Sequence, residues 1–102
     1  AEVDKADNYD WTPLSWASSN GHLEVVKTLL AAEAEVDKAD NVDQTPLHLA
    51  SLNGHMKVVK TLLAAEAEVD KVSNGGKTPL HMALHFNHTE IVALLRAAGA
   101  TE

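Results

Sequence analysis

The chain contains six histidines, and their number and spacing raise the question of a metal site. His22, His55 and His88 recur every 33 residues. Such a repeat would set them about one helix spacing apart, roughly 8–10 Å, which is too far for one metal ion bound at ~2.0–2.1 Å. His81 and His85 have the i, i+4 spacing that can hold zinc, but no Glu lies between them and no third ligand is evident beyond His88. We expect neither a metal site nor a cofactor.

Ser15 and His48 form the one pair that could act in nucleophilic catalysis, if stacked repeats bring them together. A serine nucleophile also needs an orienting acid and an oxyanion hole. The next position in the series is His81 rather than a carboxylate, and no Gly-x-Ser-x-Gly motif surrounds Ser15. The segment 74–78 also lacks the spacing of a phosphate-binding loop. We expect no enzyme, and keep a designed serine–histidine hydrolase on a repeat scaffold as an alternative.

The net charge of the chain limits the classes of partner that it can bind. With 15 acidic and 8 basic residues, the formal net charge is −7, which opposes binding to nucleic acid or to an anionic membrane. The chain has no cysteine, which excludes disulfides and thiolate metal sites. No apolar run approaches the ~18 residues of a membrane span, and the polar start predicts no signal peptide. A natural chain would then be cytoplasmic, although composition alone does not choose a compartment.

The elements that must position these residues come from a 33-residue repeat. Residues 1–33 and 34–66 differ at only seven positions, residues 67–99 continue the register, and 100–102 begin a fourth unit. We expect one domain over 1–102. Such near-identity favours recent duplication or design, and of the two we favour design.

Each unit predicts two helices and a loop. In the first unit, Thr12-Pro13 starts a short helix to about Ser19, because Thr caps free amides and Pro suits the first helical position. Asn20-Gly21 ends that helix. A second helix, with an apolar stripe, runs from about 23 to 31, and residues 45–64 and 78–97 repeat the pair. The Asp- and Asn-rich stretch 34–43 predicts an extended loop or hairpin. Three stacked pairs would share the core that one pair cannot form.

The motif Thr45-Pro46-Leu47-His48-Leu49-Ala50, then Asn53-Gly54-His55 and the apolar run at 58–63, resembles the ankyrin repeat over the whole chain. The resemblance implies an all-α solenoid of stacked helix–turn–helix units with projecting β-hairpin loops. It also implies a non-catalytic module that binds proteins through the hairpin tips and the concave face of the first helices. His48 and His81 would hydrogen-bond a neighbouring Thr or the backbone.

The sequence departs from the family pattern in three ways. Glu33 and Glu66 stand where the family has Gly after the second helix, and Asp10 and Asp43 stand at the tip in place of Gly. A left-handed residue other than Gly costs ~1 kcal/mol, and less for Asp, so either the backbone shifts or these units are strained. Ser and Trp at 15 and 16 replace the expected His and Leu.

The positions at which the units differ predict the binding surface, because shared residues specify the fold. In the family, and in the engineered ankyrin binders that this chain resembles, these positions mostly face the partner. Aromatic residues at such places are typical binding anchors. The acidic surplus favours a neutral or basic patch on a protein partner. The predicted contact residues are Tyr9, Trp11, Ser15, Trp16, Ser19, Val42, Gln44, His48, Leu52, Asn53, Lys77, His85 and Phe86.

Two alternatives stay open. Trp16 could replace a core leucine, with Tyr9 and Trp11 merely covering the N-terminal end. The chain could also be an idealised scaffold without a partner, a monomer or one that weakly self-associates through its aromatic residues.

Overall fold

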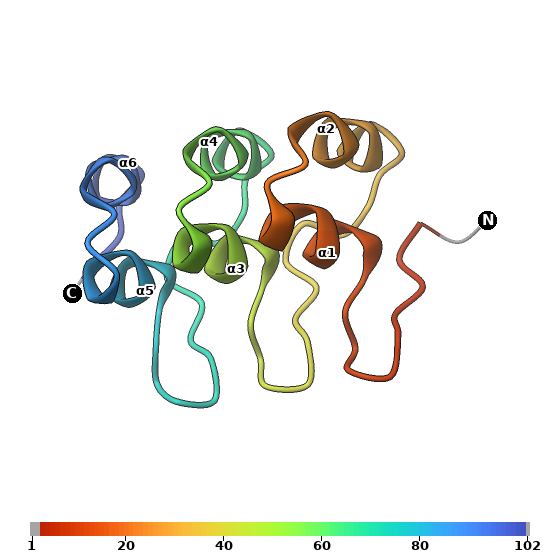
Figure 1. Cartoon of the computed structure of the whole chain (residues 1–102), viewed down its shortest axis with the longest axis horizontal. Helices are drawn as coiled ribbons and strands as arrows, with labels where there is room; N and C mark the ends of the chain where they lie inside the picture. Colours follow the sequence, from red (N-terminus) through yellow and green to blue (C-terminus); the bar gives the residue numbers. More distant parts are fainter. Residues whose placement is uncertain (1–2, 102) are drawn as a thin grey trace.

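The computed structural model describes residues 3–101 and contains three stacked helix pairs (Figure 1). We call residues 3–33 unit one, 34–66 unit two and 67–99 unit three. The first helices of the units form one row and the second helices another, with the loops extending beyond the first row (Figure 1). The all-α repeat fold predicted from the sequence is confirmed. The helices are α1 (Pro13–Asn20), α2 (Leu23–Ala31), α3 (Pro46–Asn53), α4 (Met56–Ala64), α5 (Pro79–His85) and α6 (Thr89–Ala97).

The starts of the first helices confirm the Thr-Pro prediction. The Thr12 hydroxyl accepts the backbone N–H of Ser15, and Thr45 and Thr78 cap α3 and α5 in the same way. Pro lies in the first turn each time, where its missing N–H is not needed. Gly21 and Gly54 end α1 and α3 in the left-handed conformation. This turn sends each second helix back against the first.

The core lies between the two helix rows and runs through all three units. Leu14, Leu47 and Leu80 occupy the same repeat position and have no exposed surface. Leu62 and Leu95 are equally buried on the second helices. Each first helix packs against the next first helix, so the apolar contacts of one unit are completed by its neighbour.

Histidines at the inter-helix turns join successive units. The His55 Nε2–H donates to the Ser19 carbonyl at 2.9 Å, and the His88 Nε2–H donates to the Leu52 carbonyl at 3.1 Å. Asp37 and Asp70 accept backbone N–H groups 31 residues further on. These recurrent bonds fix the spacing of the stack.

The loops are hairpin-shaped but form no β-strand within residues 3–101, which corrects the predicted β-hairpin. Each loop is closed by a few backbone bonds of its own. We call the loop that precedes α1 loop one and the loop that precedes α3 loop two. In loop one, the Asp7 N–H donates to the Trp11 carbonyl at 3.0 Å, and the Asp10 N–H donates to the Asp7 carbonyl at 3.0 Å. These bonds do not form a regular ladder within residues 3–101.

The backbone does not shift at the positions where Gly was expected. Asp10 and Asp43 have φ of 62° and 61°, and Glu33 and Glu66 both have φ of 68°. These residues keep the left-handed conformation, so the strain predicted as one of two outcomes is the one observed. Asn87 also has a positive φ, 61°, at the end of α5, a substitution for Gly that our sequence interpretation missed.

Candidate protein-binding surface

Asp7 organises the first loop and fastens it to α1. Its Oδ1 accepts the backbone N–H groups of Tyr9 and Trp11 at 2.9 and 3.0 Å. Its Oδ2 accepts the indole N–H of Trp16 at 3.0 Å. One carboxylate therefore holds three predicted contact residues in a fixed relation to one another.

The protonation of Asp7 depends on the same contacts. Desolvation by the surrounding loop would raise the pKa of Asp7, but hydrogen bonds from Trp11, Tyr9 and Trp16 outweigh it and hold the pKa below its usual value. Asp7 is thus charged at neutral pH while it holds the loop.

The two tryptophans of unit one pack against each other at the surface. The ring centroids of Trp11 and Trp16 are 4.6 Å apart, with the planes tilted by 57°. Trp16 is 50% exposed, whereas Leu49 at the same position of unit two is 2% exposed. Trp16 therefore does not replace a core leucine, and the alternative that it does is wrong.

The loop of unit two is held by Asp40, the counterpart of Asp7. The Asp40 Oδ1 accepts the N–H groups of Val42 and Gln44 at 3.0 and 2.9 Å. Its Oδ2 is buried and has no hydrogen-bond partner among residues 3–101, because Leu49 offers no donor where unit one has Trp16. This buried oxygen leaves part of the negative charge uncompensated.

Backbone bonds join the tips of neighbouring loops. The Asn41 N–H donates to the Tyr9 carbonyl at 3.1 Å, and the Asn74 N–H donates to the Val42 carbonyl at 3.0 Å. Tyr9 and Val42 are 64% and 44% exposed. The tips of loops one and two therefore form one continuous edge that carries an aromatic and an apolar side chain.

Unit three contributes a basic and aromatic end. Lys77, His85 and Phe86 are exposed, and the Phe86 ring meets the edge of His85 with centroids 4.6 Å apart. Lys77 and His85 also line a hollow of about 150 Å³ beside α5, together with His81 and Met82.

Two further predicted contact residues on the first helices are linked to each other. The Asn53 side-chain N–H donates to the Ser19 carbonyl at 3.0 Å and to the Ser19 hydroxyl at 3.1 Å. Asn53 is exposed, while Ser19 and Leu52 are half-buried. These three residues lie where α1 and α3 end, and the side-chain bond aligns the two helices there.

The prediction that Ser15 and His48 contact a partner is wrong, because both side chains have no exposed surface. The Ser15 hydroxyl is hydrogen-bonded with the Thr12 hydroxyl at 3.1 Å. The His48 Nδ1 accepts the Thr45 N–H at 3.0 Å, and the opposite Nε2–H donates to the Lys77 carbonyl at 2.9 Å. Both ring nitrogens of His48 are occupied, so His48 does not act as a base on Ser15. The resemblance-based expectation of a bond to Thr is confirmed, as it is for His81.

Burial controls the charge of His48. Desolvation lowers its pKa below 6.5, and it outweighs the raising effects of the Lys77 and Lys71 backbone bonds and of the Asp40 charge. His48 is thus a neutral, structural side chain that crosses from unit two to unit three.

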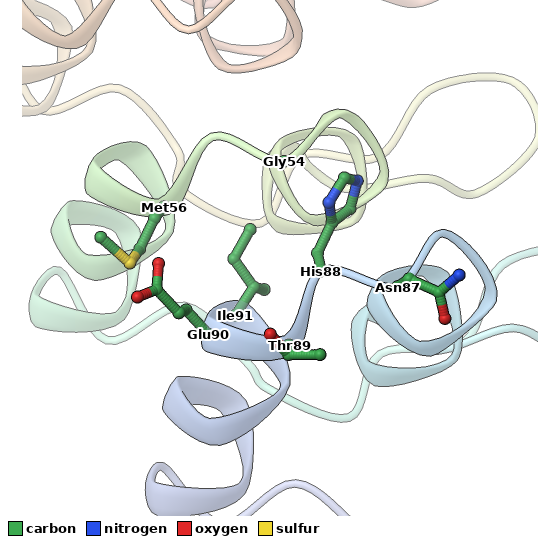
Figure 2. Close-up of a pocket in the computed structure, with 7 residues that line it drawn as sticks. All are labelled: Gly54, Met56, Asn87, His88, Thr89, Glu90 and Ile91. Carbon is green, nitrogen blue, oxygen red and sulfur yellow. The ribbon is translucent and has the colours of Figure 1, made fainter.

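A second hollow, of about 320 Å³, lies on the side of the inter-helix turns of units two and three. Figure 2 shows the His88 ring directed toward Gly54 and the Met56 and Glu90 side chains at the opposite end. A Cβ atom at Gly54 would lie 2.7 Å from the His88 ring, so the glycine makes room for the inter-unit bond. None of the residues that line this hollow is a predicted contact residue, and His88 serves the bond between units two and three.

Our sequence interpretation missed Asp7 and Asp40 as the residues that shape the loops. The signal was present in the repeated Asp-Asn pairs at 7–8 and 40–41, since an Asp that accepts N–H groups two and four residues on is typical of tight turns. Within residues 3–101, no group of three His, Asp or Glu side chains could hold a metal ion. None of the helices in that range has the length and apolar character to cross a membrane.

Comparison with known families agrees with this geometry. A family model described as ankyrin repeats (3 copies) matches residues 33–101, and one described as ankyrin repeat matches residues 9–41. No curated protein matches the sequence. Ankyrin repeats generally mediate protein–protein interactions, and proteins built from them are typically not enzymes. By its repeat, its stacked helix pairs and both model matches, the chain belongs to the ankyrin repeat family.

Proposed function

We propose that this protein is a non-catalytic module that binds another protein through its loop tips and its first-helix face. The observation that carries the proposal is the exposure of aromatic side chains on this side, with Tyr9 64%, Trp16 50% and Phe86 48% exposed. Aromatic residues are enriched at the centres of protein interfaces. Exposing them is unfavourable in a chain that has no partner.

The rigidity of the loops supports the same function. Asp7 fixes the backbone of the first tip and the ring of Trp16, and the Asn41 N–H bond to Tyr9 joins the next tip to it. A surface that is ordered before binding loses little conformational entropy when a partner docks. We therefore expect a heterocomplex with a protein whose contacting patch is neutral or basic.

The binding mode can be tested by comparing two sides of the molecule. The double variant Tyr9→Ala, Trp11→Ala removes two aromatic rings from the first loop, and Phe86→Ala removes one from unit three. Val25→Ala is the matched control, because Val25 is 49% exposed but lies on α2, in the second-helix row. Each truncated anchor should cost ~2 kcal/mol or more of binding free energy.

The measurement is capture of partners by each immobilised variant, with bound proteins identified by mass spectrometry. Proteins bound by the unmodified chain and by Val25→Ala, but lost with Tyr9→Ala, Trp11→Ala, would support the proposed surface. Unchanged capture by the double variant would reject it. Circular dichroism of all variants checks that helical content is preserved.

A scaffold without a partner is the second candidate, and the contact between Trp11 and Trp16 is the observation that favours it. In that case the rings would serve stability alone. Thermal melts of Trp11→Ala and Trp16→Ala would then show large losses, and capture would recover nothing specific.

We also propose that units one and two share a recent origin by design or duplication, since 33 − 7 = 26 of their positions are identical. The encoding DNA offers a test. A recent natural duplication predicts shared codons at nearly all identical positions, whereas unrelated codons at those positions would favour design.

A further inference from the structure

The two joined tips of loops one and two combine aromatic surface with negative charge. Tyr9 and Trp16 expose half or more of their surface. Asp10 and Asp43 lie at the two tips and are exposed, and the Asn41 N–H bond to the Tyr9 carbonyl joins these tips. Aromatic faces attract cations, and exposed carboxylates pair with them.

The negative charge of this region exceeds what its own hydrogen bonds compensate. Asp7 is ionised and exposed, although its oxygens accept three N–H groups. The Asp40 Oδ2 in loop two is buried without a partner among the described residues. A partly desolvated carboxylate extends its field further than one in water.

The tip of unit three and the three first helices carry no carboxylate. Unit three carries Lys77 at the tip position, and its first helix carries His81 and His85. Helices α1 and α3 contain no Asp, Glu, Lys or Arg. On this surface the carboxylates thus lie in loops one and two, beside the exposed ring of Tyr9 and near Trp16 of α1, which Asp7 binds.

From this placement we propose that the tips of loops one and two form a subsite for an arginine side chain of the protein partner. The guanidinium plane stacks on an exposed ring of Tyr9 or Trp16, while its N–H groups pair with the carboxylates of Asp10 and Asp43. Arginine suits the site better than lysine, because a planar guanidinium can stack and donate to carboxylates at the same time. The subsite rests on the proposed function and specifies the chemistry of the partner.

The probe is the blocked tripeptide acetyl-Gly-Arg-Gly-amide, titrated into the ¹⁵N-labelled full chain at low ionic strength and neutral pH. The matched control is acetyl-Gly-citrulline-Gly-amide, which has nearly the same shape without the charge. We expect saturable NMR shifts at the backbone amides of residues 9–11 and 42–44 and at the Trp16 indole N–H. The citrulline peptide should bind at least about fivefold more weakly, and the lysine analogue should fall between them.

Variants of the chain test the carboxylates. The double variant Asp10→Asn, Asp43→Asn keeps the left-handed tips, which Asn tolerates, and should weaken arginine binding about five- to tenfold. The double variant Glu24→Gln, Glu90→Gln is matched in charge but alters α2 and α6 in the second-helix row, and it should stay within about twofold of the unmodified chain. Trp16→Leu introduces the residue of unit two and tests the ring.

Equal binding of the arginine and citrulline peptides, or equal effects of the two double variants, would overturn the subsite. So would shifts spread evenly over α2, α4 and α6. These failures can be told apart from failure of the proposed function. Partner capture that is lost with Tyr9→Ala, Trp11→Ala but insensitive to the arginine peptide would keep the binding module and reject the arginine subsite.

Discussion

Units one and two have nearly the same sequence and the same backbone, yet equivalent positions differ in exposure and in hydrogen bonding. In unit one, Trp16 lies half exposed and donates to Asp7. In unit two, Leu49 is buried and the equivalent Asp40 oxygen has no partner within residues 3–101. Seven differences in 33 positions thus change the surface, while core residues such as Leu14 and Leu47 are the same in both units. The shared residues build the stack, and part of the variable set determines what that stack presents.

The same comparison shows that variable does not mean exposed. Ser15 and His48 differ between the units, but both are interior residues. His48 spans the boundary to unit three, where its Nε2–H binds the Lys77 carbonyl, whereas Ser15 bonds within its own helix cap. This pair therefore distinguishes the two units in stability rather than in recognition.

The largest expected effect on stability follows from giving unit two, at His48, the serine of unit one. His48→Ser removes the bond to the Lys77 carbonyl and leaves space in the core, so it should lower the free energy of unfolding by about 2–4 kcal/mol. Chemical denaturation monitored by circular dichroism measures this value. The reverse variant, Ser15→His, should be stabilising if its ring reaches the Gln44 carbonyl, the equivalent of that of Lys77. A loss below about 0.5 kcal/mol in His48→Ser would contradict the structural role of His48.

A smaller effect is expected from exchanging the residues at 16 and 49. Leu49→Trp brings a larger ring into a site with neighbours on both sides, and overpacking costs about 1–3 kcal/mol. A new bond to the buried Asp40 Oδ2 would return only about 1 kcal/mol, so the variant should be destabilised by about 1–2 kcal/mol. Trp16→Leu should change stability by less than about 1 kcal/mol, because its ring is half exposed. Equal effects in thermal melts of the two variants would show that the sites are equivalent.

Acidification should lower the stability of the chain through His48 of unit two, a residue that unit one replaces with Ser15. Burial holds the pKa of His48 below 6.5, so the unfolded chain takes up a proton first as the pH falls. The stability contributed by neutral His48 is complete above that pH and declines as the pH falls below it. The melting temperature should therefore drop between about pH 7 and pH 5, and the drop should be shallower in His48→Ser. Identical pH profiles would exclude His48 as the source.

The smallest effect concerns the ends of the second helices. Glu66 has φ of 68°, whereas unit three has Gly99 at the same position. Glu66→Gly relieves the left-handed strain, so it should raise the free energy of unfolding by about 0.5–1 kcal/mol, partly offset by the added freedom of the unfolded chain. Glu68→Gly is a suitable control, because it lies outside the set of residues with positive φ. A loss of stability in Glu66→Gly would show that the side chain matters more than the backbone.

The fold could be predicted from the sequence because its signals are local and repeated. Thr-Pro starts, the Gly21 and Gly54 stops and the apolar stripe each recur three times or nearly so, and the helix bounds follow within about two residues. The loops could not be predicted in the same detail. Their shape depends on which N–H groups the carboxylates of Asp7 and Asp40 accept, and the β-strands of the hairpins that the family resemblance implied do not form in the described residues.

The candidate surface could be predicted only in part, for a physical reason. Comparing repeats identifies where residues differ, but burial depends on the neighbouring unit. Position 16 is half exposed and position 49 is enclosed, although the two are equivalent in sequence. A hydrogen bond that crosses from one unit to the next, such as the bond from His48 to the Lys77 carbonyl, is equally invisible in a single repeat.

The most direct test of the account is amide hydrogen exchange of the chain, free and saturated with a partner recovered by capture. The account predicts slower exchange in the complex for residues 9–11, 42–44 and 85–86, with α2, α4 and α6 unchanged. Protection confined to α2, α4 and α6, with the loop tips unaffected, would contradict it.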